Sequence, residues 1–318
     1  MSETVVSAAS VDVARSSDVA SCAEGWMATV VAFLIWGFFP LYLKPLQGVE
    51  SFQIIAHRVV WGCALVFVWL FFRGDLANLR HLLRTPAVLG RLTLSAVLIS
   101  ANWLLYVWGV THGHVVEGSL GYFINPLVNV LLGVAVLRER LSVAQWASVA
   151  IAVLAVVYLG VVAGTPPWLS LSIAVSFSLY GFIRKIVHVE ALQGLAVETL
   201  ILVPVAIGYL LWCEAAGGGV FGHGSLEVSA FLIGAGPVTA VPLFLFAFGA
   251  RRIPYSTVGV LMYIAPSLQL LVGIFLYHEP FPATRAVGFA MIWLALVIYV
   301  GEGLWRARKE RAGRPLDV

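Results

Sequence analysis

A histidine and an arginine stand side by side within the apolar run "SFQIIAHRVVWGCALVFVW" (51–69). A charged side chain that faces hydrocarbon is costly, so Arg58 is expected to face protein, water or a bound group. Its guanidinium could bind an anionic or carbonyl group of a substrate, or anchor a gate. It could equally form a structural ion pair or extend towards the nearer membrane surface. His57 points about 100° away from it around a helix, so the two need not line one cavity.

Two carboxylates are candidates to meet the Arg58 charge. Glu117 opens a predicted helix on the same side of the membrane as Arg58, at a shallower depth, and is the better ion-pair partner. Glu198 lies in another predicted helix, nearer the opposite side. A buried carboxyl can take up and release a proton, so Glu198 is the candidate proton carrier, and proton coupling is a hypothesis.

Amide side chains recur within the predicted spans. Asn125 and Asn129 are four residues apart in "NPLVN", so a helix brings them to one face. Pro126 leaves a backbone carbonyl free one turn earlier. These groups form either a polar ladder that faces substrate or hydrogen bonds between helices. Gln269 stands at the position that corresponds to Asn129 in a second copy of this segment.

Aromatic side chains also fall inside apolar runs, where they could line a cavity for a flat organic solute. The alternative is packing, or the belt of Trp and Tyr at the membrane surfaces. The candidates are Trp36, Trp103, Tyr106, Tyr122, Tyr180 and Tyr263.

Composition predicts the class of protein that must position these residues. Of the 318 residues, 61% are hydrophobic and only 11% are charged, against about 25% charged in soluble domains. The apolar blocks are long enough for helices of roughly 20 residues, which cross about 30 Å of hydrocarbon. We therefore predict an all-α polytopic membrane protein with ten transmembrane helices. They are placed at about 26–44, 51–72, 92–111, 115–137, 143–162, 167–184, 193–213, 227–249, 255–277 and 283–305.

The basic residues predict an orientation in a cytoplasmic membrane. With both termini inside, 16 of the 19 Lys and Arg residues fall in cytoplasmic segments, and only Lys44 and Arg285 fall outside. This asymmetry obeys the positive-inside rule, so the net charge of +3 reflects topology and does not imply a nucleic acid partner. The predicted divisions are a disordered cytoplasmic tail (1–24), two five-helix repeats (25–163 and 164–305) and a basic cytoplasmic tail (306–318).

An internal repeat supports this division. "EGSLGYFINPLVNVLLGVAVLRERL" (117–141) aligns without a gap on "TVGVLMYIAPSLQLLVGIFLYHEPF" (257–281), and both contain P-x6-G-x5-E. An odd number of helices separates the copies, so the second crosses the membrane in the opposite sense. Inverted repeats are typical of alternating-access transporters, although channels and purely structural duplications also contain them. The repeat-related Glu139 and Glu279 are read as structural or gating residues at helix ends.

The sequence resembles the drug/metabolite transporter superfamily, in its EamA-type branch and close to the RarD-type proteins. The resemblance rests on "FLIWGFFPLYLK" (33–44), "HRVVW" (57–61), "ANWLLYVWGV" (101–110), "EGSLGYFINPLVNVLLG" (117–133) and "FSLYGFIRK" (177–185). It implies a cytoplasmic-membrane transporter whose central cavity is lined by helices 1–4 and 6–9, with helices 5 and 10 at the periphery.

The predicted function is therefore secondary transport of a small organic solute that is metabolite-like, amino-acid-like or drug-like. A channel or a sensor that does not transport is the alternative. Motifs for a phosphate-binding loop, a zinc hydrolase or a serine hydrolase are not found in the sequence, so ATP hydrolysis and intramembrane enzymes are not favoured. No metal or other cofactor is predicted. The expected partners are substrate, lipid and a candidate coupling proton, in a monomer or homodimer.

Overall fold

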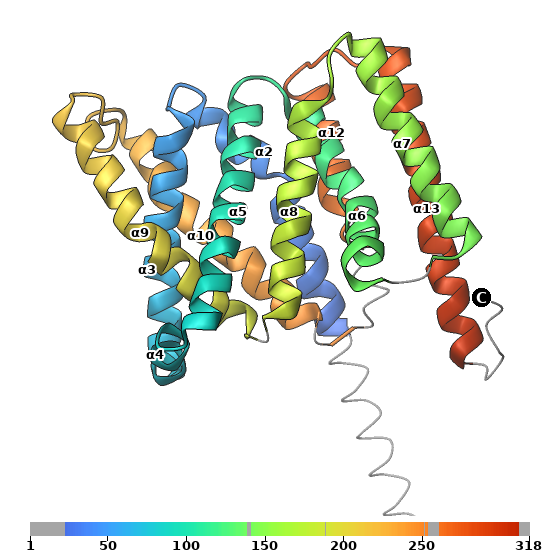
Figure 1. Ribbon diagram of the computed structural model, residues 1–318. Helices are drawn as coiled ribbons and strands as arrows, with labels where there is room; N and C mark the ends of the chain where they lie inside the picture. Colours follow the sequence, from blue (N-terminus) through green and yellow to red (C-terminus); the bar gives the residue numbers. More distant parts are fainter. Residues whose placement is uncertain (1–22, 139–140, 188, 251, 254–260, 312–318) are drawn as a thin grey trace, which may run out of the picture.

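The computed structural model describes residues 23–138, 141–187, 189–250, 252–253 and 261–311, and within these ranges the regular elements are all helices (Figure 1). After a first helix, Ala23–Gly37, the elements are α2 (Phe39–Leu43), η1 (Lys44–Leu46), α3 (Ser51–Arg73), α4 (Leu76–Leu83), α5 (Pro86–Thr111), α6 (Val115–Leu137), α7 (Val143–Ala163), α8 (Trp168–Ile186), α9 (Ala191–Ala215), α10 (Leu226–Ala250), α12 (Ile264–Phe275) and α13 (Ala283–Arg311).

Seven of the described helices are long and apolar enough to cross a membrane, or eight if the bent pair Ala23–Gly37 and Phe39–Leu46 counts as one span. Two further apolar helices are shorter, Trp168–Arg184 and Ile264–Phe275. This composition and architecture fit a polytopic membrane protein. The predicted count of ten spans stays a prediction, since α12 follows residues 254–260, which lie outside the described ranges.

The first predicted span, 26–44, is broken rather than continuous. Its two parts meet at an angle of 43°, and Pro40 explains the break, because proline has no N–H to donate to the carbonyl of Trp36 one turn earlier. That carbonyl instead accepts a hydrogen bond of 3.0 Å from Nε2 of Gln269 on α12. The break thus joins the first helix to a helix far along the sequence.

Several predicted boundaries shift by a few residues. Helix α5 begins at Pro86, not near residue 92, with the proline at its first position, where a missing N–H is harmless. Helix α13 continues to Arg311, so the basic segment begins inside this helix. The predicted disordered tail lies almost wholly outside the described residues, as does Glu139.

Helices α7 and α13 pack along each other at one edge of the structure (Figure 1). Only 28% of the most apolar 18-residue stretch of each helix is buried. Large apolar side chains on both helices, such as Val157 and Val297, are exposed. Exposed apolar surface of this extent suits contact with lipid. The other helices form the main bundle, where α3 packs against α9 and α10, and α8 packs against α5 and α6.

The bundle has two ends, which we name from Figure 1. Helices α3, α6 and α8 begin at the upper end, whereas α5, α7 and α9 begin at the lower end. Close helix contacts occur at glycines. A Cβ atom on Gly236 of α10 would lie 2.5 Å from the backbone carbonyl carbon of Trp61 on α3, so only glycine allows these two helices to approach this closely.

Candidate substrate site

Arg58 lies about 10 Å from the start of α3, at 1.5 Å per residue. Its side chain is buried, with 7% of the residue exposed. The guanidinium carbon lies 4.2 Å from the ring centroid of Trp103 and 4.9 Å from that of Phe39. Aromatic rings attract a cation at such distances, and more strongly where water is excluded. The arginine charge is therefore stabilised by rings contributed by α5 and α2.

The Arg58 guanidinium has no ion-pair partner among the described residues. Its Nε atom is buried without a hydrogen-bond partner in the same part of the chain, and so is the hydroxyl of Tyr106. Unsatisfied buried donors are rare and costly, so each needs an explanation. Here two of them occur close together in the interior of an apolar bundle.

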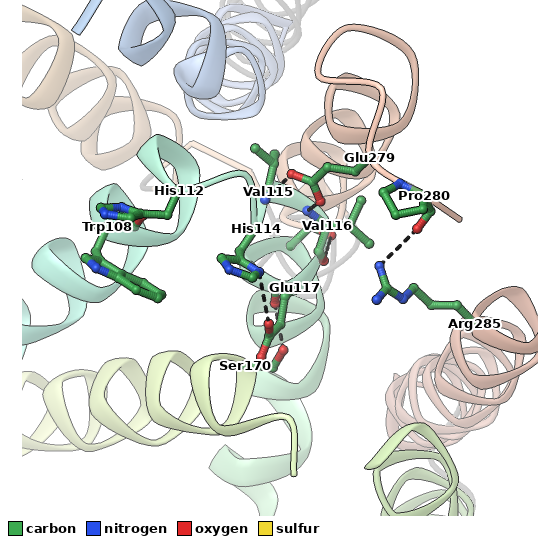
Figure 2. Close-up of polar contacts among 11 residues, drawn as sticks. Trp108, His112, His114, Val115, Val116, Glu117, Ser170, Glu279, Pro280 and Arg285 are labelled. Atoms are coloured by element: carbon green, nitrogen blue, oxygen red, sulfur yellow. Dashed lines mark hydrogen bonds and ion pairs between the residues drawn. The ribbon is translucent and has the colours of Figure 1, made fainter. Parts of the chain in front are cut away.

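The expected partner of Arg58, Glu117, is turned elsewhere. Its carboxylate lies 3.7 Å from Nδ1 of His114 and its side chain is 28% exposed. Figure 2 shows this pair at the upper end, where the backbone carbonyl of Glu117 also accepts a hydrogen bond from Ser170. The Arg58–Glu117 ion pair is therefore not formed, because Glu117 lies in the first turn of α6 and faces the preceding loop.

A row of rings runs away from Arg58 through the bundle. Successive centroids in this aromatic row are 6.1, 5.4, 5.8 and 5.9 Å apart, which are normal contact distances between aromatic side chains. The row comes from α2, α5, α6 and α8, four helices distant in sequence. Its members are, in order, Phe39, Tyr106, Tyr122, Phe177 and Tyr180.

Asn102, which was not predicted from the sequence, supports the middle of the aromatic row. It is fully buried on α5 and donates from Nδ2 to the carbonyl of Ile173, at 2.9 Å, and to the hydroxyl of Ser176, at 3.1 Å. Its Oδ1 accepts from the Tyr122 hydroxyl at 3.3 Å. The signal was available, since this amide immediately precedes Trp103 in "ANWLLYVWGV" and stands mid-span.

The far end of the aromatic row reaches Glu198. This residue of α9 is 1% exposed, and its carboxylate accepts a hydrogen bond of 2.6 Å from Ser95 of α5. Nη1 of Arg184 lies 3.7 Å from the same oxygen, and Tyr180 is close enough to interact with the carboxyl. Arg184, the last residue of the predicted span 167–184 and one of the basic residues counted as cytoplasmic, thus contributes to a buried cluster. Gly194 on α9 leaves the space that this guanidinium occupies.

Another polar contact joins two segments far apart in sequence at the upper end. After α12, Glu279 accepts hydrogen bonds from the backbone N–H groups of Val115 and Val116, at 2.5 and 2.9 Å (Figure 2). These N–H groups open α6 and lack helical partners, so a carboxylate suits them. Burial raises the pKa of the Glu279 carboxyl above its usual value, although both N–H groups, His114 and Arg285 act in the opposite direction.

His57 lies apart from the aromatic row. It is buried, and its ring centroid lies 5.0 Å from that of Phe221 in the loop between α9 and α10. Gln53, one turn earlier on α3, holds the same loop by donating to the carbonyl of Gly218 and accepting from the N–H of Val220. This part of α3 therefore anchors a loop at the upper end, while Arg58 faces the bundle.

The remaining predicted residues divide between structural contacts and other clusters. Asn125 is buried and its side chain accepts a hydrogen bond from Ser178 on α8, which is the interhelical role, while Asn129 is exposed. The two amides therefore do not form one ladder. Trp36 and Gln269 meet through the bond described above, and Tyr263 packs on Phe123 of α6. Within the described ranges, no hydrogen bond or ring contact links these three residues to the aromatic row.

Comparisons with known proteins agree with this architecture. Residues 24–161 match the EamA-like transporter family. Protein RarD of Streptomyces exfoliatus is 44% identical over 88% of this chain and 89% of its own length, and protein RarD of Escherichia coli K12 is 38% identical over 92% and 99%. The uncharacterized transporter PA0485 of Pseudomonas aeruginosa is 42% identical over 91% and 96%.

A solved crystal structure resembles the fold. Its TM-score is 0.57 at 19% sequence identity, over 88% of this chain and 96% of that chain. At this identity the likeness concerns the fold alone. The family match and the relatives, which are similar over nearly their whole length, place the chain among the EamA-like transporters, as a multi-pass membrane protein close to the RarD proteins.

Proposed function

We propose that this protein is an alternating-access secondary transporter that carries a small organic solute along the aromatic row. The observation that carries the proposal is the buried Arg58 guanidinium, which no described acid neutralises, at one end of a continuous row of rings. A site lined by aromatic groups with a few convergent polar groups is the usual form of a small-molecule site. The relatives named as transporters support the same class of function.

The spacing of the helices supports two inverted five-helix repeats. Helices α9, α10 and α13 begin at Ala191, Leu226 and Ala283, each 140 residues after the starts of α3, α5 and α7. This offset equals that of the aligned Pro-Gly-Glu segments. In Figure 1, α3 runs downwards and α9 upwards, while α5 runs upwards and α10 downwards. Opposite directions of this kind are expected if the second repeat is inverted.

In the proposed orientation the lower end is cytoplasmic and the upper end faces outside. The α3–α5 connection at the lower end carries Arg73, Arg80 and Arg84, as the positive-inside rule favours. Arg58 is then nearer the outside and Glu198 nearer the cytoplasm. Substrate would bind Arg58 when the upper end is open. Uptake and release of a proton by Glu198 would couple the proton gradient to the return of the protein to its starting conformation.

Counterflow in proteoliposomes tests this proposal. Purified protein should accumulate an externally added labelled solute transiently when the lumen holds an excess of the same unlabelled solute, with saturation as its concentration rises. The panel should include amino acids, nucleosides, aromatic acids and chloramphenicol, since one relative is named chloramphenicol-sensitive protein RarD. Flux that rises linearly without counterflow would identify a channel, and binding without any flux would identify a sensor.

The Glu279 contact at the upper end should act as the outer closure. Replacing it by glutamine puts amide N–H groups against the donors of Val115 and Val116, so E279Q should populate an open upper end. We expect the uptake rate to fall about tenfold, because losing the charge-assisted hydrogen bonds should cost about 1.4 kcal/mol, which corresponds to a factor of ten. Electron–electron distance measurements between spin labels at positions 112 and 284 should show an added population with a longer distance than in the wild-type protein.

The matched control is E227Q, which neutralises an exposed carboxylate in the first turn of α10. It should leave the spin-label distances and the uptake rate at their wild-type values. If E279Q gives the same distances as E227Q, the Glu279 contact is a helix cap without a gating role.

A further inference from the structure

We infer that the site at Arg58 takes an organic monocarboxylate with an aromatic or other flat apolar body and without an ammonium group. The inference rests on the proposed transport function and specifies its substrate class. Three features carry it, namely the donors at the site, the surrounding rings and the distribution of acidic groups.

Two polar groups at the site are unsatisfied donors. Nε of Arg58 and the hydroxyl of Tyr106 are both buried without partners among the described residues. The Tyr42 hydroxyl donates to the carbonyl of Phe231, so it is occupied. A ligand that enters must therefore supply acceptors, and a carboxylate supplies two oxygens in a plane that matches the guanidinium edge.

The charge at the site favours a carboxylate over a neutral carbonyl. Arg58 carries a full charge with 7% of the residue exposed, and no carboxylate oxygen of the described residues lies within 4.0 Å of it. Rings reduce the cost of this buried cation without neutralising it. An anionic ligand removes the imbalance, whereas an alcohol, amide or ketone would leave it in place.

The rings determine the body of the ligand. Trp103 and Phe39 lie against the guanidinium, and Tyr106 and Tyr122 follow within the aromatic row. Their combined surface suits a flat apolar group that stacks while its carboxylate meets Arg58. A small polar acid would place hydroxyl or further charged groups against these rings.

The acidic groups argue against a zwitterion. In an α-amino acid the ammonium group is two bonds from the carboxylate carbon, so it would lie near the Arg58 guanidinium when the carboxylate binds. The buried acid of the aromatic row, Glu198, is at the opposite end and already meets Ser95 and Arg184. A second cation beside Arg58 would therefore be repelled. Glu279, an acid within electrostatic reach of Tyr106, already accepts hydrogen bonds from Val115 and Val116.

Calorimetric titration of the purified full-length protein with four matched phenyl compounds tests this inference. The probes are 3-phenylpropionate, phenylalanine, phenethylamine and 3-phenylpropanol. We expect 3-phenylpropionate to bind at least tenfold more tightly than phenylalanine, and the amine and the alcohol to give no measurable binding. R58Q should lower the affinity for 3-phenylpropionate at least tenfold. R80Q, which changes an exposed arginine of α4, should leave this affinity unchanged.

The selectivity of the wild-type protein decides the question even if R58Q fails to fold. Equal binding of phenylalanine overturns the exclusion of zwitterions. Preference for the amine or the alcohol, or no binding of 3-phenylpropionate, overturns the anionic class. In each of these cases counterflow of another solute would leave the transport function standing, so the two proposals fail separately. Y106F, which removes one hydroxyl, should weaken the binding of 3-phenylpropionate several-fold and leave the result for 3-phenylpropanol unchanged.

Discussion

R58M should fold at least as stably as the wild-type protein and yet transport at less than a hundredth of its rate. Methionine is shorter and ends where Nε of Arg58 lies, but it is flexible and apolar and can pack beside Trp103 and Phe39 while the charge is lost. No described acid loses an ion-pair partner when Arg58 is replaced. Replacing a buried charge by an apolar side chain is often neutral or stabilising for the fold. A hundredfold loss corresponds to about 2.8 kcal/mol, within reach of charge-assisted hydrogen bonds to substrate.

The lysine variant sharpens this prediction. R58K retains the charge but replaces the planar fork of donors by a compact, strongly hydrated ammonium group. It should recover no more than a tenth of the wild-type rate, because the bidentate geometry is lost. Thermal unfolding in detergent and initial uptake rates are measured on the same preparations. If R58M is clearly less stable and still transports, Arg58 is a structural residue.

E198Q should lose uptake driven by a pH gradient by at least tenfold while it keeps exchange between labelled and unlabelled solute. The amide is close in shape to the carboxylate, and its oxygen can still accept from Ser95, but it cannot release a proton. Coupling therefore fails while substrate binding at Arg58, the other end of the aromatic row, continues. Parallel measurements of gradient-driven uptake and exchange in proteoliposomes separate the two activities.

The control for this variant is E214Q, which removes an exposed carboxylate near the upper end of the same helix. Glu214 pairs with His223 at the surface, and its loss should leave coupling intact. Full gradient-driven uptake by E198Q would exclude Glu198 as the proton carrier.

The membrane class and most helices could be predicted from sequence, because apolar blocks and their breaks depend on local composition. Arg58 could also be selected, since a charge within such a block is unfavourable unless it faces protein, water or a bound group. What failed was its partner. Glu117 is near Arg58 in depth, but depth does not fix the direction of a side chain, and Glu117 turns towards His114 three residues earlier.

Contacts that depend on tertiary structure were only partly predictable. Tyr106, Tyr122 and Tyr180 were selected because they fall inside apolar runs, and the structure joins them in the aromatic row. Trp36 met the same criterion but lies elsewhere, because Pro40 breaks its helix and turns the segment towards α12. Arg184 was counted only as a cytoplasmic basic residue at the end of the predicted span 167–184, since a basic residue at a helix end is usually a topology signal. The packing of α8 against its neighbours brings it to Glu198.

The most direct test of alternating access is the labelling of one cysteine from each side of the membrane. Ser176 of α8 lies beside Asn102 at the middle of the aromatic row, so S176C, with Cys22, Cys63 and Cys213 replaced, reports access to the proposed path. Membrane-impermeant thiol reagents should label it from either face, and E279Q should increase labelling from outside while decreasing it from the cytoplasm. Labelling that rises from both faces together, or occurs from neither face, would contradict the account.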